Sequence, residues 1–137
     1  MSSASFPAVM PKNPQTSLDI LVIDDELLIR WSLNETLTAA GHLVTEAVDR
    51  ASAIQTLKTR PQPDVVLLDY RLPDSDDLGL LAAVREIAPG AQVIMMTAFG
   101  TADMTRKALE LGAYRVVSKP FEVQELAALV EQASRER

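Results

Sequence analysis

The sequence predicts an α/β protein, a doubly wound three-layer sandwich in which helices cover both faces of a parallel β-sheet. Strand-like and helix-like segments alternate five times along the chain, with connections of only a few residues. Residues 65–68 form an unbroken Val and Leu run between prolines, which is typical of a strand buried on both faces. With 137 residues, 47% of them hydrophobic, the chain can form one domain with a substantial core.

The chain divides into three parts of different composition. Residues 1–17 are rich in Ser and Pro and lack a continuous apolar segment, so we expect a flexible leader and not a signal peptide. Residues 18–134 carry the alternating pattern and form the expected domain. Residues 135–137 are its C-terminal end or the start of a linker.

The first half of the domain is expected to hold three strands and two helices. The strands are expected over 18–23, 43–47 and 63–69, and the helices over 26–40 and 50–59. Apolar residues recur at helical spacing in the first helix, and Gly41 can end it. The second helix is expected to place Ala51, Ile54 and Leu57 on its apolar face, and Pro61 stops it.

The second half continues the alternation with three helices and two strands. The helices are expected over 78–88, 102–111 and 122–134, and the strands over 92–96 and 114–118. Leu81, Val84 and Ala88 predict the apolar stripe of the first of these helices. Gly112 is expected to end the second.

The composition excludes several classes of function. Thirteen basic against nineteen acidic side chains give a net charge of −6, which argues against direct electrostatic contact with nucleic acid. No segment is long and apolar enough to cross a membrane. The absence of cysteine excludes disulfides and thiol chemistry and is consistent with a cytoplasmic location. His42, the only histidine, follows a helix-ending glycine and is expected to be an exposed loop residue without a catalytic role.

Polar residues stand at the ends of four predicted strands: Asp24 and Asp25, Asp69, Thr97 and Lys119. The carboxyl ends of parallel strands share one edge of the sheet, where open α/β sheets bind ligands. In the flavodoxin-like strand order 2-1-3-4-5 the first and third strands are neighbours, so the three carboxylates are expected to converge. Their mutual repulsion is relieved by a cation, and an all-oxygen ligand set suits Mg²⁺.

These residue types together favour phosphoryl chemistry. Beside a bound divalent cation, Lys119 can neutralise one phosphoryl oxygen and the Thr97 hydroxyl can donate to another. Asp69 is central and is therefore the candidate nucleophile. Its attack on phosphorus gives an aspartyl phosphate, which water later hydrolyses, so the chemistry suits a timed switch.

Four segments resemble the receiver domain of two-component response regulators, in order and at familiar spacing: residues 20–26, 65–73, 95–100 and 117–121. The resemblance covers residues 18–133 and implies that a partner sensor histidine kinase phosphorylates Asp69. It further implies that Asp25, Asp69 and the backbone carbonyl of Arg71 coordinate Mg²⁺, with Asp24 assisting through water. Thr97 and Lys119 would bind the phosphoryl group, and the peptide bond after Lys119 would be cis.

Within that family, residues 97–101 and 111–114 look most like receivers of enhancer-binding transcription activators. The resemblance therefore implies control of transcription through an effector domain, without nucleic-acid contact by this domain itself. It also implies a homodimer through the fourth helix, fifth strand and fifth helix. The first helix is the usual docking face for the kinase, so Leu27 and Trp31 either dock the kinase or tuck against a neighbouring helix.

The chain departs from the family pattern at two positions. An aromatic switch residue is common three places before the active-site lysine, where this chain has Val116. Tyr114 lies two residues earlier and is expected on the same face of the strand by alternation. Asp77 occupies a position where glycine is usual, and a positive φ there would strain it.

Rival interpretations explain less of the pattern. A Mg²⁺-dependent phosphatase of the haloacid dehalogenase type also uses a strand-end Asp, but it needs a second Asp where this chain has Arg71. A nucleotide or flavin binder would need a Gly-rich phosphate loop, and the sequence has none of the familiar types. Residues 74–85 begin like a calcium loop but end in Arg85 in place of Glu, so a solvated loop is expected. Helix capping by Asp24, Asp25 or Thr97, or a surface role for Lys119, would leave their shared edge unexplained.

Overall fold

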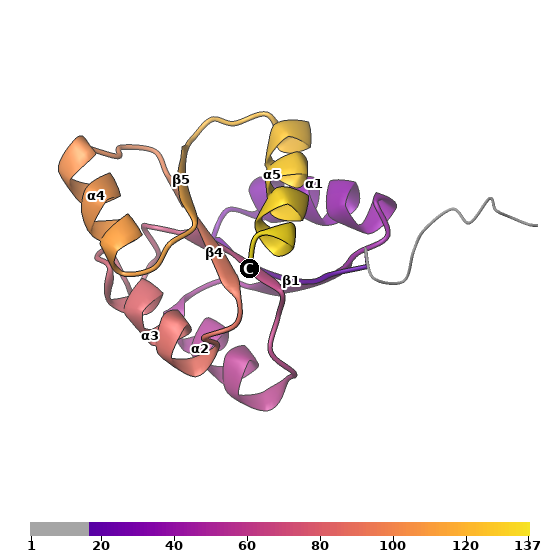
Figure 1. Cartoon of the computed structure of the whole chain (residues 1–137), viewed down its shortest axis with the longest axis horizontal. Coiled ribbons are helices and arrows are strands. Elements are labelled where there is room, and N and C mark those ends of the chain that lie inside the picture. The colour runs from indigo at the N-terminus through magenta and orange to yellow at the C-terminus, as the bar shows by residue number, and fades with distance from the viewer. Residues whose placement is uncertain (1–16) are drawn as a thin grey trace, which may run out of the picture.

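The computed structural model describes residues 17–137, so the predicted leader lies outside the described residues except for its last position. Strands and helices alternate throughout the described chain (Figure 1). The strands are β1 (Asp19–Ile23), β2 (Leu43–Ala47), β3 (Val65–Asp69), β4 (Gln92–Thr97) and β5 (Arg115–Ser118). The helices are α1 (Leu27–Ala39), α2 (Arg50–Thr59), α3 (Gly79–Ile87), α4 (Ala102–Glu110) and α5 (Val123–Arg135). Each predicted element is confirmed, with ends that shift by one or two residues.

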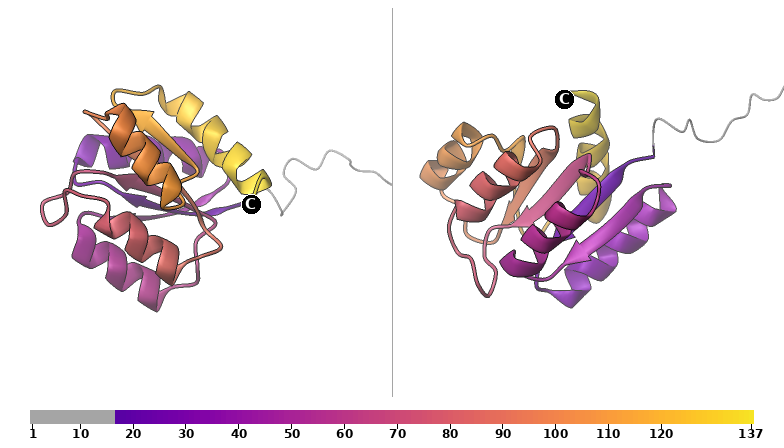
Figure 2. Two further views of the ribbon diagram at one scale, coloured as in Figure 1. Left: turned by 60° about the vertical axis from the view of Figure 1, so that its left-hand side comes forward. Right: turned by 90° about the horizontal axis from the view of Figure 1, so that it is seen from below.

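The five strands form one parallel sheet in the order β2-β1-β3-β4-β5, as predicted. Figure 2 shows α2 and α3 side by side on one face of the sheet and α1 and α5 together on the other. Every residue of the central strand β3 is buried, because successive side chains enter opposite layers of the core. Val66 and Leu68 pack with α2, α3 and α4, whereas Val65 and Leu67 pack with α1 and α5.

The helix ends follow the local sequence. Gly41 and Gly112 adopt φ values of 97° and 105° after α1 and α4, a conformation that costs glycine least. Asp49 and Ser52 form a reciprocal capping box at the start of α2. Thr101, not Thr97, caps α4 by accepting a hydrogen bond from a backbone N–H, so the capping interpretation of Thr97 is wrong.

Two expectations about burial are wrong. On α2 the predicted Leu57 is buried and Ile54 packs against the core, but Ala53 is buried in place of the exposed Ala51, so the expectation for Ala51 is wrong. His42 is buried, with 3% of its surface exposed. The chain turns at Gly41 and runs back beside the start of β1, where the His42 Nδ1 atom accepts a hydrogen bond from the Leu18 N–H at 3.1 Å.

The two departures from the family pattern also differ from expectation. Tyr114 precedes β5 and packs in the layer of α1 and α5, whereas Val116 packs in the opposite layer. The alternation rule fails because it applies only within the strand. Asp77 is not strained, since no non-glycine residue in the described chain has a positive φ, and its Oδ1 accepts a hydrogen bond from the Gly79 N–H at 2.8 Å.

Among residues 17–137, no helix has both the length and the apolar character needed to span a membrane. The peptide bond between Lys119 and Pro120 is cis, as the family resemblance implied.

Candidate functional site

The sheet register brings the predicted site residues to one edge. Ile23 pairs with Leu68, so the residues that follow them, Asp24 and Asp69, lie side by side. Thr97 pairs with Ser118, the residue before Lys119. The Lys119 N–H donates to the Thr97 carbonyl at 2.8 Å, so both residues lie at the same edge of the sheet. A pocket opens at this edge. It is lined by Asp25, Glu26, Asp69, Arg71, Thr97 and Lys119, together with neighbouring loop residues.

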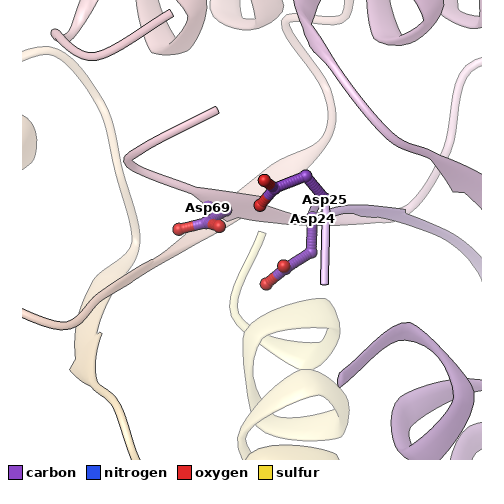
Figure 3. Close-up of side chains that lie close together, drawn as sticks. All are labelled: Asp24, Asp25 and Asp69. Atoms are coloured by element: carbon purple, nitrogen blue, oxygen red, sulfur yellow. The ribbon is translucent and has the colours of Figure 1, made fainter. Parts of the chain in front are cut away.

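Three carboxylates converge at this edge of the sheet (Figure 3). One carboxylate oxygen from each of Asp24, Asp25 and Asp69 lies within 4.8 Å of the others. Asp24 and Asp69 are buried, and Asp25 is exposed. Negative charges at this separation in a partly desolvated site repel one another, and an oxygen-rich cluster of this kind fits a hard divalent cation.

Lys119 contacts three carboxylates. Its Nζ atom lies 2.9 Å from Asp24 Oδ2, 3.1 Å from Glu26 Oε1 and 3.2 Å from Asp69 Oδ2. An ammonium group has three N–H donors, and each now has a carboxylate partner. Burial lowers the pKa of Lys119, but the hydrogen bonds to Asp24 and Glu26 and the nearby negative charges outweigh burial. The net pKa lies above its usual value, so Lys119 is charged at neutral pH.

Asp69 has a raised pKa of about 6. Burial is the largest cause, and the charge of Asp24 raises the pKa further. The charge and hydrogen bond of Lys119 and the N–H of Arg71, 3.3 Å from Asp69 Oδ1, act in the opposite direction. Part of the population is therefore protonated near neutral pH when no cation is bound. A bound cation would favour the carboxylate form, which is the form able to attack phosphorus.

Asp24 does not act as a conventional helix cap. Its Oδ1 accepts a hydrogen bond from the N–H of Glu26, the N-cap residue of α1, at 2.9 Å. Its second oxygen faces Lys119. The buried carboxylate thus connects the end of β1 to the lysine after β5.

Thr97 is buried at the pocket wall, with 3% of its surface exposed. Its Oγ1 atom accepts a hydrogen bond from the Phe99 N–H at 3.2 Å. Since a hydroxyl can donate as well as accept, Thr97 retains a proton for an oxygen in the pocket.

The predicted docking residues and two of the predicted switch residues, Val116 and Tyr114, lie outside the pocket, whereas the third switch residue, Thr97, lines it. Leu27 and Trp31 are 68% and 59% exposed on α1, so most of each side chain faces solvent. Val116 is partly buried in the core beside α4. The hydroxyl of Tyr114 donates to Glu136 Oε1 at 2.8 Å, in the layer of α5.

Glu26 is a residue of the pocket that the sequence prediction did not include among its ligands. It directly follows the acidic pair and contacts Lys119, yet it is mostly exposed. Its position next to Asp25 was the only available signal, because its contact spans 93 residues of sequence.

Comparison with known proteins identifies the family. The family model described as the response regulator receiver domain matches residues 20–131. The transcriptional regulator NtrC of Escherichia coli K12 is 38% identical over 114 residues, which cover 83% of this chain and 24% of NtrC. Sporulation initiation phosphotransferase F of Bacillus subtilis is 36% identical over 107 residues, which cover 78% of this chain and 86% of that protein. The chain thus spans about a quarter of the length of the NtrC relatives.

Solved structures give the same assignment. NtrX of Brucella abortus superposes with a TM-score of 0.80 and 34% identity, covering 88% of this chain and 28% of NtrX. The BeF3-activated receiver domain of DrrB superposes with a TM-score of 0.76 and 29% identity, covering 88% of this chain and 99% of that domain. These relatives give the phosphatase alternative no support. The chain belongs to the receiver domains of two-component response regulators, which are phosphorylation-switched signalling domains.

Proposed function

We propose that Asp69 is the phosphate acceptor of this domain and that a partner sensor histidine kinase supplies the phosphoryl group. The observation that carries the proposal is the buried Asp69 carboxylate, which has Asp24 and Asp25 oxygens within 4.8 Å and Lys119 Nζ at 3.2 Å. Receiver domains of this family are phosphorylated by sensor histidine kinases. The domain would promote only the phosphorylation and the later dephosphorylation of its own Asp69 side chain.

The acidic pocket fits Mg²⁺. Asp25, Asp69 and the backbone carbonyl of Arg71 would hold the ion, and Asp24 would assist through water. When bound, the ion supplies positive charge against the carboxylates and the transferred phosphoryl oxygens. The converging oxygens support this assignment, and the charge of Asp24, which adds to burial in raising the pKa of Asp69, is one that a bound cation would offset.

The residues divide the chemistry among them. An Asp69 carboxylate oxygen attacks the phosphorus of a phosphohistidine, so that a P–O bond forms as the P–N bond breaks and the imidazole nitrogen takes a proton. Lys119 and Thr97 bind phosphoryl oxygens through charge-assisted hydrogen bonds. Water later attacks phosphorus, which releases inorganic phosphate and restores the carboxylate. To bind a phosphoryl oxygen, Lys119 must give up one of its three carboxylate contacts.

The output of the domain is proposed from its relatives and its surface. NtrC is named as a DNA-binding transcriptional regulator, and we assign this domain to the control of such an activator, with no direct nucleic-acid contact. Leu27 and Trp31 on α1 form the proposed kinase-docking face, since both are exposed. Dimerisation through α4, β5 and α5 is the proposed route to the effector, with Val116, Thr97 and Tyr114 as the candidate switch residues. The cytoplasmic location stays a prediction.

A fluoride analogue of the acyl phosphate tests the site without a kinase. The similar DrrB receiver is described in a BeF3-activated form. We expect NMR amide shifts at the ends of β3, β4 and β5 when beryllofluoride and Mg²⁺ are added together. The Asp69→Ala variant removes the carboxylate that the analogue needs and should show no such shifts. Equal shifts in both proteins would overturn the assignment of Asp69.

A further inference from the structure

The loop between β3 and α3 is tied to a helix that lies far away in the sequence. Asp74 places its carboxylate at the N-terminus of α2, where Oδ1 accepts from the Arg50 N–H at 2.7 Å and Oδ2 accepts from the Ala51 N–H at 3.1 Å. These contacts span 24 and 23 residues. The carboxylate occupies two backbone donors that a helix cannot satisfy internally, at the end where the helix dipole favours negative charge.

Helix α2 is already capped by Asp49, so the helix does not depend on Asp74 for its N-terminal cap. Asp49 Oδ1 already accepts the Ser52 N–H at 2.8 Å, and Ser52 returns the bond in a capping box. The contact from Asp74 therefore adds a connection between two elements. Because one side of the connection is helix backbone, the position of the Asp74 carboxylate is fixed by α2.

A tight turn transmits this position toward the pocket. The Leu72 N–H donates to the Ser75 carbonyl at 2.7 Å, and the Ser75 N–H donates back to the Leu72 carbonyl at 3.2 Å, with Pro73 and Asp74 at the tip. Leu72 is 4% exposed and anchored in the core. The turn thus behaves as one unit, and Arg71 is the residue directly before it.

We propose that Asp74 is a positioning residue for the phosphorylation site. By anchoring the turn to α2, it holds the backbone carbonyl of Arg71 at the acidic pocket, which is lined by residues 71–73 but not by Asp74 itself. The consequence for phosphoryl transfer rests on the proposed function. Outer contacts that orient a metal ligand typically change metal affinity by about tenfold or more when they are removed.

Three variants separate positioning from charge and from helix capping. Asp74→Ala removes both acceptors, and Asp74→Asn keeps one oxygen. Asp76→Ala removes the same charge from an exposed position in the same loop and is the matched control. The Mg²⁺ affinity of the full chain is measured by NMR titration of the amides of residues 69–73. Hydrogen exchange of the Arg50 and Ala51 amides reports the state of the α2 contact.

Mg²⁺ affinity is expected to fall about tenfold in Asp74→Ala, by less in Asp74→Asn, and little in Asp76→Ala. Amide protection at Arg50 and Ala51 should fall only in the Asp74 variants. If that protection falls while Mg²⁺ affinity equals that of Asp76→Ala, Asp74 merely caps α2 and the proposal is overturned. Should Asp74→Ala fail to fold, the same comparison of Asp74→Asn with Asp76→Asn decides the question.

Phosphorylation of the same samples by a small phosphodonor separates this inference from the proposed function. A wild-type chain that binds Mg²⁺ but takes no phosphate would overturn the role of Asp69, while the Mg²⁺ titration would still decide the role of Asp74. Normal phosphorylation of the wild type, with equal Mg²⁺ affinities in all variants, would overturn the role of Asp74 alone. A wild-type chain without measurable Mg²⁺ affinity would overturn both.

Discussion

Lys119 is shared by three carboxylates, and this sharing sets what must happen when a phosphoryl group arrives. Asp24 is fully buried and has a second hydrogen bond, and Asp69 is the proposed phosphate acceptor. Glu26 is 58% exposed and can be hydrated when it leaves. We therefore expect Glu26 to be the partner that Lys119 exchanges at least cost, and to compete with the incoming phosphoryl oxygen for Lys119.

Glu26→Gln is expected to increase the initial rate of phosphorylation by a small phosphodonor by about two- to fivefold, since exposed ion pairs contribute up to about 1 kcal/mol. The neutral amide holds Lys119 less strongly and repels an anionic donor less. Glu35→Gln, which removes the same charge from an exposed position on α1, is the control and should match the wild type. A Glu26→Gln rate at or below that of Glu35→Gln would contradict this role.

The raised pKa of Asp69 predicts how stability depends on pH without Mg²⁺. The usual value is 3.8 and the folded value about 6, so the folded state binds this proton more tightly than the unfolded state. This proton therefore stabilises the folded state below about pH 4, and the stabilisation is lost as the pH rises through about 6. Relative to Asp69→Asn, the wild type should lose about 2 to 3 kcal/mol of unfolding free energy between pH 4 and pH 7.

Urea unfolding of both proteins at several pH values, with a chelator present, measures this difference. Added Mg²⁺ at pH 7 should restore part of the loss in the wild type and none in Asp69→Asn, because a bound cation stabilises the carboxylate form. A stability difference that stays constant across this pH range would show that the Asp69 carboxylate is not destabilised by its surroundings.

At the scale of elements, His42 connects the residue before β1 to α5, at the end of the sheet opposite to the acidic pocket. Its Nδ1 accepts from the Leu18 N–H, and its Nε2 lies 3.3 Å from Glu131 Oε2. His42→Ala leaves the buried Leu18 N–H without its acceptor, so we expect a loss of about 1 to 3 kcal/mol of unfolding free energy at pH 7. Chemical denaturation checks this. A loss near zero would mean that water replaces the imidazole without cost.

The exposed end of α1 carries the proposed docking of the kinase. Trp31→Ala should slow phosphoryl transfer from the cognate kinase by about tenfold, in the range expected for an aromatic residue at an interface. Transfer from a small phosphodonor should be unchanged, because Trp31 does not line the pocket. Leu43→Ala, which shortens another exposed apolar side chain on β2, is the control. Equal losses with both donors would point to a folding defect and against docking.

The sequence predicted the elements well because each is specified locally, by apolar spacing and by glycines or prolines at the ends. It also predicted the pocket, since parallel strands that end in polar residues must share one edge. His42 and Glu26 were misplaced or overlooked because their partners lie far away in the sequence, and Tyr114 was misplaced because strand alternation does not extend to a residue before β5. Asp77 was expected to be strained only because of a family comparison, and the loop avoids the positive φ.

At the scale of the whole molecule, the sheet order explains why the site forms. Placing β1 next to β3 brings Asp24 and Asp25 to Asp69, and placing β4 and β5 beyond them brings Thr97 and Lys119. The loops at this edge, including the turn held by Asp74, complete the pocket. The same topology places α1 beside α5, so the proposed kinase-docking face adjoins the proposed dimer surface.

Intact mass measurement after incubation with Mg²⁺ and a small phosphodonor tests the central claim most directly. The wild-type chain should gain one phosphoryl group, whereas Asp69→Ala and the wild type with a chelator should gain none. Asp64→Ala removes a carboxylate at the opposite end of β3 and should label like the wild type. A wild-type chain that stays unlabelled, or an Asp69→Ala variant that labels equally, would contradict the account.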